Sequence, residues 1–313
     1  MFTESNTVEA YLRDLLAGPV QETVPGIAGE PGPLYTIARA ARGTGWRYVS
    51  PANLPRQSHE VFVESYLRDA LLRLNPEIKE QPDRADEVIY KLRAIVLSVR
   101  SDGLIRANEE MTAWLRGERT MPFGLNHEHL PVRLINFDLS SSADPDRNDY
   151  VVTPQYTFRA GPTEKRADLM LLVNGLPLVL IEAKTPVRRA TSWVDGALQV
   201  HEDYEKFVPE LFVFNVFSVA TEGKEFRYGA IGVPIKDWGP WNLVPSPPTP
   251  LPRGEGRNLC GMKAAAESML RPHIVLDILA DLPCSPPRRR NNGARSSAVI
   301  SNTTPQTGSW SGC

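Results

Sequence analysis

One short stretch of the chain, residues 165–184, constrains the fold more than any other. Two apolar runs of strand length flank the Asn-Gly pair at 174–175. This pair is the strongest short-range signal for a β-hairpin, because both residue types tolerate a positive φ. The acidic Asp168 enters the first strand at the open end of the ribbon, and Glu182 and Lys184 leave the second strand there.

The register of this hairpin decides whether the two acids meet. Side chains alternate across a strand, so Glu182 and Lys184 point to the same face of the sheet. A two-residue turn pairs Asp168 with Ile181 and places the acids on opposite faces. A three-residue loop or a one-residue bulge restores a common face, and Pro177, which cannot donate to a ladder, is a suitable place for a bulge. We therefore predict an odd-length loop or a bulge.

Two carboxylates that converge beside an ammonium can hold a hard cation. Oxygen ligands suit Mg²⁺, which lowers the pKa of a bound water and offsets charge developing on a phosphate. Asp168 and Glu182 are the candidate metal ligands and catalytic acids, and Lys184 can orient the water or stabilise an oxyanion. The alternative is an ordinary exposed ion pair at a sheet edge, worth about 0–1 kcal/mol.

The same stretch resembles the PD-(D/E)xK nuclease motif of the N-terminal domain of type I restriction enzyme R (restriction) subunits. Ala167 stands where a proline commonly precedes the aspartate. The matching segments are residues 166–169, 173–178 and 181–186, with further likeness at 132–138, 148–152 and 208–212. The resemblance implies an α/β (α+β), restriction-endonuclease-like core, with a mixed sheet flanked by helices.

The function implied by the resemblance is Mg²⁺-dependent hydrolysis of double-stranded DNA. The implied partners are the methylation and specificity subunits of a type I restriction-modification complex. In the intact family protein, cleavage is coupled to ATP-driven translocation. No Gly-x-x-x-x-Gly-Lys-[Ser/Thr] loop occurs in this sequence, so ATP would act only through a motor domain absent from this chain. Two alternatives stay open: an inactive, truncated docking module, and a stand-alone repair or resolvase-type nuclease of the same fold.

Three further residues are candidates for the site. In nucleases of this fold an acidic residue of the first helix can approach the metal, which makes Glu9, on a helix predicted over 6–16, a candidate; a solvated helix glutamate is the alternative. The family places a glutamine and a tyrosine, usually spaced Gln-x-x-x-Tyr, on a helix that begins here near Ser192. Gln199 and Tyr204 are one residue too far apart for that pattern, so the roles of both stay open, and core packing is the alternative for Tyr204.

The net charge of −2 neither favours nor excludes a nucleic-acid partner. A nuclease needs only a local cationic rim, for which Arg166, Lys184, Arg188 and Arg189 are candidates. No apolar run is long enough to span a membrane, the N-terminus lacks the features of a signal peptide, and the three cysteines show no disulfide or metal spacing. These features predict a cytoplasmic protein.

The remaining pattern predicts the domain organisation. We expect a nuclease domain over 1–242, with a helical part over 1–130 and a catalytic core over 131–242. A Pro/Gly-rich linker, one helix over 267–282 and a disordered tail are expected within 243–313, where an insertion and a frame change would end a normally longer subunit. Helices are predicted over 60–74, 86–99 and 104–117, and strands over 132–137, 150–158, 211–220 and 228–233.

Overall fold

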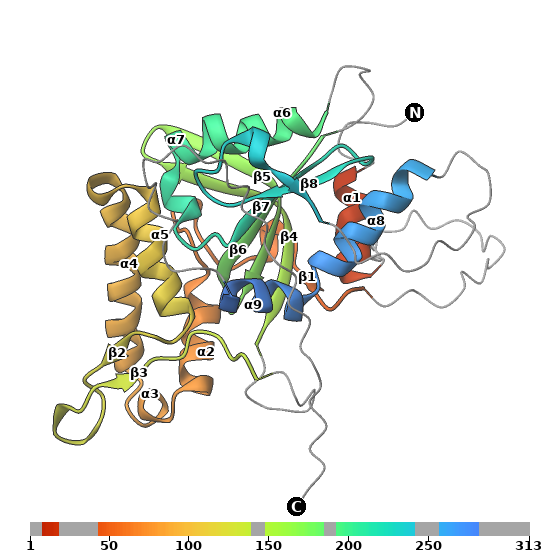
Figure 1. Cartoon of the computed structure of the whole chain (residues 1–313). Coiled ribbons are helices and arrows are strands. Elements are labelled where there is room, and N and C mark those ends of the chain that lie inside the picture. Colours follow the sequence, from red (N-terminus) through yellow and green to blue (C-terminus); the bar gives the residue numbers. More distant parts are fainter. Residues whose placement is uncertain (1–7, 19–42, 139–147, 185–191, 242–256, 282–313) are drawn as a thin grey trace, which may run out of the picture.

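A seven-stranded mixed sheet forms the centre of the computed structural model (Figure 1), which describes residues 8–18, 43–138, 148–184, 192–241 and 257–281. The strand order is β1-β4-β5-β6-β7-β8-β9. These strands are β1 (Arg47–Tyr48), β4 (Tyr150–Ala160), β5 (Thr163–Val173), β6 (Leu176–Ala183), β7 (Phe217–Thr221), β8 (Phe226–Gly229) and β9 (Gly239–Pro240). The β1–β4 and β6–β7 pairs are parallel and the other neighbours are antiparallel. A separate pair joins β2 (Thr120–Met121) to β3 (Leu130–Pro131).

Helices flank this sheet, which confirms the predicted α/β architecture. They are α1 (Val8–Ala17), α2 (Glu64–Leu74), α3 (Pro76–Glu80), α4 (Arg84–Asp102), α5 (Leu104–Leu115), α6 (Trp193–Leu198), α7 (Glu205–Phe207), α8 (Arg257–Met269) and α9 (Pro272–Asp281). A π-helical turn, η4 (Gln199–Tyr204), joins α6 to α7. In Figure 1, α4 and α5 lie together beside the sheet, α1 and α8 lie together at its opposite end, and α6 and α7 run over the strands. Within the described ranges, no helix has the length and apolarity needed to cross a bilayer.

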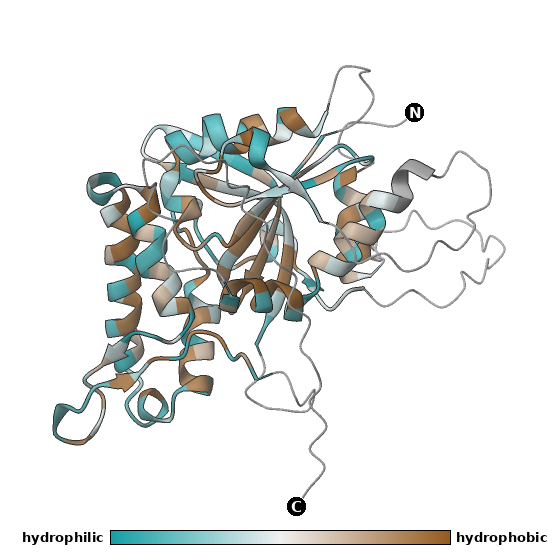
Figure 2. Cartoon of the chain, in the orientation of Figure 1, coloured by the Kyte–Doolittle hydropathy of each residue, from teal (hydrophilic) through white to brown (hydrophobic). Residues whose placement is uncertain are grey.

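The central strands are apolar along almost their whole length (Figure 2) because helices cover them. Every residue of β7 and all of β6 except Ala183 are buried. Helix α1 shows the complementary pattern, since Val8, Leu12 and Leu16 are spaced on one face and all three are buried. The central strands β6 and β7 are therefore packed on both faces by the core.

The turn of the β5–β6 hairpin has two residues, with φ angles of 52° at Asn174 and 81° at Gly175. Two positive φ angles are what a type I′ turn requires. A Cβ atom at Gly175 would lie 2.5 Å from the carbonyl oxygen of Val63, so only glycine fits between the turn and the start of α2. The turn is thus the two-residue type and not the three-residue loop.

The hairpin register shifts by one residue near the turn. Leu172 pairs with Pro177, but Leu171 pairs with Val179, which leaves Leu178 as an extra residue on β6. This is the one-residue bulge that the sequence predicted next to Pro177. From Val179 to the open end of the hairpin, the pairing is shifted by one residue, and this shift places Asp168 and Glu182 on the same face.

The strand predicted over 132–137 is wrong, since these residues form an irregular segment after β3. Their backbone groups bind three buried asparagine side chains instead of a neighbouring strand. Asn75 Oδ1 accepts from the Arg133 N–H, Asn148 Oδ1 accepts from the Asn136 N–H, and Asn174 Nδ2 donates to the Leu134 carbonyl oxygen. Because side-chain amides satisfy these groups, the segment needs no ladder to be buried.

Two other predicted strands are shorter or displaced. Within 211–220, only residues from Phe217 onward belong to a strand, β7. Residues 211–212 end a 3₁₀ turn, η5 (Pro209–Phe212), and an irregular turn follows it. Strand β8 ends at Gly229 and does not extend through the predicted 228–233. Apolar runs of this kind mark burial, and burial alone does not separate a strand from a packed turn.

The single helix predicted over 267–282 is also wrong, because two helices, α8 and α9, occupy this region. Pro272 begins the second helix, at a position where its missing N–H costs nothing. Both helices pack on the core: Trp46 Nε1 donates to the Leu270 carbonyl oxygen at 2.6 Å, and Arg116 Nε donates to that of Leu279 at 2.9 Å. The Pro-rich stretch over 242–256 and the tail after Asp281 lie outside the described residues.

Candidate active site

The β5–β6 ladder brings two acids face to face. The outermost pair of the ladder is Leu169 with Ile181, and one further step places Asp168 opposite Glu182. Directly opposed residues of an antiparallel pair lie on the same face of the sheet. Asp168 Oδ2 also accepts a hydrogen bond of 2.8 Å from the Ala183 N–H. The predicted meeting of the two carboxylates is therefore found in the structure.

Glu182 is the most deeply buried member of the pair, with 1% of its surface exposed. Its Oε2 atom is buried and has no hydrogen-bond partner among the described residues. Burial, and then the charge of Asp168, raise the pKa of Glu182 to about 8, while Lys184 opposes the shift. Burial likewise raises the pKa of Asp168. Without a cation, the pair therefore retains a proton near neutral pH, because its neighbours do not compensate two buried negative charges.

Lys184 joins the acid pair to the helix that follows it. Its backbone N–H donates to the carbonyl oxygen of Thr221 at 2.7 Å, which fixes the residue at the end of the β6–β7 pair. Its Nζ atom donates to Glu182 Oε1 at 2.8 Å and to Gln199 Oε1. The ammonium is therefore held between a carboxylate and an amide and cannot swing freely into solvent.

The π-helical turn η4 brings Gln199 and Tyr204 together despite their spacing. Five residues apart in an α-helix they would point about 140° away from each other. The wider turn places both on the side of the acids: Gln199 Nε2 donates to the Tyr204 hydroxyl, which donates to the Arg166 carbonyl oxygen at 2.8 Å. Tyr204 is buried, and burial and the charge of Glu182 raise its pKa. A series of hydrogen bonds thus links Lys184 through Gln199 and Tyr204 to the backbone of β5.

A glycine that the sequence did not single out lets α6 approach the site. The helix begins at Ser192, which forms the predicted capping box with Asp195. A Cβ atom at Gly196 would lie 3.3 Å from the Ala220 Cβ and 3.5 Å from the Glu182 Cγ. A larger residue would push the helix, and Gln199 with it, away from Glu182.

Glu9 also reaches the acid pair. Gln155 Nε2 donates to both oxygens of the Glu9 carboxylate, at 2.9 and 2.8 Å. Burial raises the pKa of Glu9, the hydrogen bond from Gln155 opposes this, and the charge of Asp168 raises it further. Glu9 therefore lies within electrostatic range of Asp168. Gln155 was not predicted, because a glutamine in a strand-like run carries no signal of its own.

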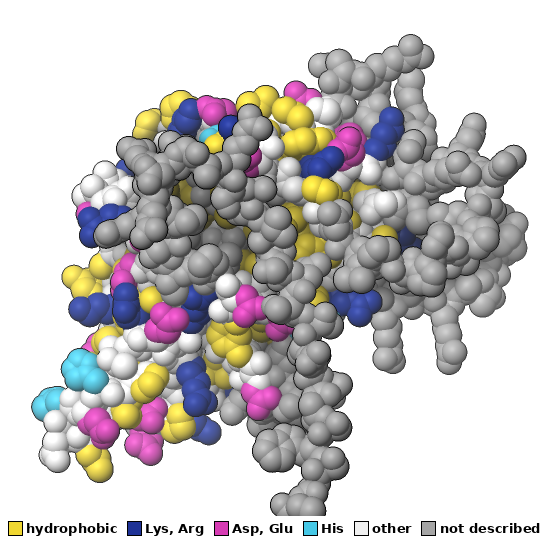
Figure 3. Space-filling model, in the orientation of Figure 1, with side chains coloured by type: hydrophobic (Ala, Val, Ile, Leu, Met, Phe, Trp, Pro, Cys, Tyr) yellow, Lys and Arg dark blue, Asp and Glu magenta, His cyan; other side chains and the backbone are white. Residues whose placement is uncertain are grey.

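The predicted cationic rim is only partly described. Arg166 is exposed and its charge acts on both Asp168 and Glu9, whereas Arg188 and Arg189 lie outside the described residues. Arg227 adds a further cation, with its guanidinium 5.4 Å from the ring centre of Trp193 at the start of α6. On the face in Figure 3, Lys and Arg side chains are interspersed with Asp and Glu over the surface that grey atoms leave visible.

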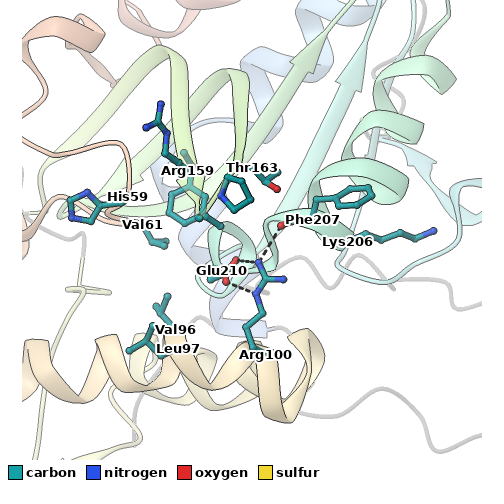
Figure 4. A pocket seen from close by; sticks show the side chains of 14 residues that line it. His59, Val61, Val96, Leu97, Arg100, Arg159, Thr163, Lys206, Phe207 and Glu210 are labelled. Atoms are coloured by element: carbon teal, nitrogen blue, oxygen red, sulfur yellow. Dashed lines mark hydrogen bonds and ion pairs between the residues drawn. The ribbon is translucent and has the colours of Figure 1, made fainter.

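A cleft of about 570 Å³ lies away from these residues, between α4, the tip of the β4–β5 hairpin and the α7–η5 segment (Figure 4). All three Lys and Arg side chains that line this cleft form ion pairs with carboxylates. Arg100 Nε lies 2.6 Å from Glu210 Oε1, Arg159 lies 2.9 Å from Glu164, and Lys206 pairs with Glu202. None of the predicted site residues lines this cleft.

The donor set of the acid pair fits a hard divalent cation. Two carboxylates converge there, and the unpartnered buried Glu182 Oε2 is an acceptor that a cation would satisfy. Within the described parts of the chain, no three His, Cys, Asp or Glu side chains gather closely enough to hold one ion. Asp168 and Glu182 are the two side chains that could hold an ion here.

Comparison with known proteins places this geometry in a family. A family model described as "Type I restriction enzyme R protein N terminus" matches residues 36–233. The chain belongs to this family. The resemblance of the sequence to the R subunits is thereby confirmed, and with it the restriction-endonuclease-like fold. Asp168, Glu182, Lys184, Gln199 and Tyr204 all lie within the matched residues, and Glu9 precedes them.

Two relatives show how far the likeness extends. The "Type I restriction enzyme HindI endonuclease subunit" of Haemophilus influenzae is 30% identical over 214 residues, which cover 64% of this chain and 19% of that protein. The "Putative type I restriction enzyme MjaIXP endonuclease subunit" of Methanocaldococcus jannaschii is 26% identical over 216 residues, which cover 65% of this chain and 20% of that protein. The match therefore spans about a fifth of each of these R proteins.

Proposed function

We propose that this chain is the endonuclease domain of a type I restriction R subunit, and that it hydrolyses phosphodiester bonds of double-stranded DNA with the help of Mg²⁺. One observation carries the proposal. Asp168 and Glu182 share a face of the sheet, and Glu182 keeps a buried oxygen without a partner next to Lys184. Membership of the R protein family supports a reaction on DNA.

Asp168 and Glu182 are the proposed metal ligands. Mg²⁺ is commonly held by one or two carboxylates and keeps several waters, which suits a site with two acids. When bound, the cation lowers the pKa of a water and offsets charge that develops on the phosphate. In its absence, the high pKa of Glu182 reflects the cost of keeping two buried carboxylates ionised side by side.

Lys184 is the proposed catalytic cation. Its ammonium can orient the attacking water through a hydrogen bond, or donate a hydrogen bond to a phosphate oxygen as negative charge grows there. Gln199 accepts from this ammonium, and Tyr204 holds Gln199 through its hydroxyl. These two residues would therefore restrict Lys184 to one orientation, which is the pre-organisation that electrostatic catalysis requires.

The partners and setting follow from the same proposal. We propose that methylation and specificity subunits read the DNA sequence and that this domain acts in the cytoplasm, with Arg166 and neighbouring cations contacting the DNA backbone. Coupling to ATP-driven translocation would require a phosphate loop, which the printed sequence does not contain.

Plasmid nicking tests the activity. The purified chain is incubated with supercoiled plasmid and Mg²⁺, beside the Asp168→Ala variant and a sample containing EDTA. We expect nicking by the native chain and none by the variant or with EDTA. Equal nicking by native and variant chains would refute the assignment of Asp168.

A pull-down with purified methylation and specificity subunits separates the alternatives. An inactive docking module would bind the subunits without nicking DNA. A stand-alone nuclease of the same fold would nick DNA without binding them. The proposed R subunit domain is expected to do both.

A further inference from the structure

Gln155 has an unusual backbone for a residue inside a strand. Its φ angle is +51°, although it lies midway along β4. The other described non-glycine residues with positive φ are Asn126, His127 and Asn174, and all three lie in turns. A glutamine adopts this left-handed conformation only where its surroundings hold it, and such strain is concentrated at functional sites.

This kink lies level with the acid pair. On either side of it, Pro154 pairs with Leu169 and Tyr156 pairs with Ala167. The position between these pairs would join Gln155 to Asp168, and it is the one step missing from an otherwise continuous β4–β5 ladder. The irregular backbone of Gln155 is therefore directly opposite Asp168.

The side chain of Gln155 leads to Glu9. Its amide nitrogen donates to both carboxylate oxygens. Helix α1 packs against β4, and its residues Val8 and Leu12 are buried. Glu9 is half-buried, and the charge of Asp168 contributes to raising its pKa. Because a regular strand would direct the glutamine elsewhere, the kink and the hydrogen bond together determine where this third carboxylate lies.

On the basis of the proposed function, we propose that Gln155 is a positioning residue that holds Glu9 near Asp168, where the Glu9 carboxylate lies outside the ligands of the divalent cation. Glu9 does not lie close enough to the pair to form a three-ligand group. It therefore acts on the waters of the ion and on the local charge. The competing explanation is a purely structural hydrogen bond that fastens α1 to the sheet.

Two variants separate these explanations. Glu9→Gln keeps an oxygen for the Gln155 amide and so keeps the fastening, but it removes the charge. Gln155→Gly keeps the left-handed backbone, which glycine adopts without strain, but it removes the amide. The probe is Mn²⁺ alone, titrated by calorimetry and by the rise in Tm that the ion produces, without DNA.

We expect each variant to bind Mn²⁺ about 10-fold more weakly than the native chain, as is common when the outer partners of a metal site are removed. The double variant should be no weaker than Glu9→Gln alone, because Gln155 acts through Glu9. Gln81→Ala, at an exposed position, is the matched control and should bind normally. Tm values without Mn²⁺ report any change in stability separately.

The outcomes distinguish this inference from the proposed function. Native Mn²⁺ affinity in Glu9→Gln and Gln155→Gly, with loss of binding in Asp168→Asn, would overturn the role of Gln155 and leave the two-acid site intact. Additive losses in the double variant would also overturn it. Native affinity in Asp168→Asn would instead overturn the metal site on which the inference rests.

Discussion

Strand β5 passes through two regions that differ in the burial and pairing of their charged side chains. Midway along it, Asp168 lies opposite Glu182, whose Oε1 atom accepts from the Lys184 ammonium and whose Oε2 atom has no partner among the described residues. At its first residue, Thr163 lines the cleft of Figure 4, where Arg100 and Arg159 each face a carboxylate. The acids of the first region are largely buried and resist being ionised together, whereas the second region is open and its cations are paired.

This difference shows that a cleft alone is a poor guide to chemistry in this molecule. The cleft of about 570 Å³ holds cations that are already paired and partly exposed, so each ion pair there contributes little. At the acid pair, burial makes ionisation of both carboxylates costly. Two largely buried acids with raised pKa values therefore mark the candidate site.

The largest expected contrast comes from exchanging one lysine in each region for methionine. Lys184→Met removes the cation beside Glu182, and we expect nicking to fall about 10²–10³-fold, as for the loss of one electrostatic donor. Lys206→Met removes a cation of the cleft and should leave nicking unchanged. Plasmid nicking rates with Mg²⁺ measure both, and circular dichroism confirms that both variants fold. Equal losses would erase the proposed distinction between the two regions.

A smaller effect is expected from Tyr204→Phe. This change removes the hydroxyl that links Gln199 to the Arg166 carbonyl oxygen, so Lys184 loses its support but keeps its charge. We expect nicking to fall about 10-fold, in line with other outer partners of metal sites. Tyr90→Phe, at an exposed tyrosine of α4, is the control. An unchanged rate would show that Tyr204 serves packing alone.

The pH dependence of stability should distinguish the regions as well. The pKa of Glu182 rises from 4.5 to about 8 on folding, so the folded protein retains this proton more tightly than the unfolded chain. Its contribution to stability is full below about pH 4.5 and is lost as the pH rises through about 8.

Metal-free native protein should therefore lose Tm over this interval, and Glu182→Gln should lose less. The difference should be several degrees, since 1 kcal/mol corresponds to about 2–4 °C in a domain of this size. Thermal melts between pH 4.5 and 9 without metal provide the measurement. Parallel Tm curves for the two proteins would contradict the raised pKa.

The smallest effect is expected in the cleft itself. Arg100→Ala breaks the pair with Glu210, in which the arginine side chain is 53% exposed, so urea unfolding should show a loss of only about 0–1 kcal/mol. Nicking should be unchanged. A larger loss of stability would mean that the cleft is also electrostatically important and would weaken the contrast with the acid pair.

The hairpin was the most predictable part of the fold, because its signals are local. The parity of the acids predicted an odd-length loop or a one-residue bulge, with Pro177 as a suitable place, and the structure has the bulge, at Leu178. The capping box at Ser192 was likewise readable, since it depends on residues three positions apart. These features follow from chemistry between near neighbours.

What the sequence could not reveal depends on distant partners. The segment over 132–137 has the composition of a strand, but three asparagines from elsewhere in the chain satisfy its backbone. The spacing of Gln199 and Tyr204 argued against a shared role until the π-helical turn was seen to absorb the extra residue. Gln155 and Gly196 carry no local signal, because their positions matter only through what packs against them.

The bulge residue Leu178, although uncharged, determines which face of the sheet Glu182 and Lys184 occupy. If the ribbon paired regularly from the turn onward with all its residues kept, Ile181 would lie opposite Asp168, and Glu182 and Lys184 would rotate to the opposite face of the sheet. Deletion of Leu178 would instead remove the bulge and leave Glu182 opposite Asp168. A designer who wished to straighten the ribbon and keep its functional end would therefore have to shorten β6 by one residue.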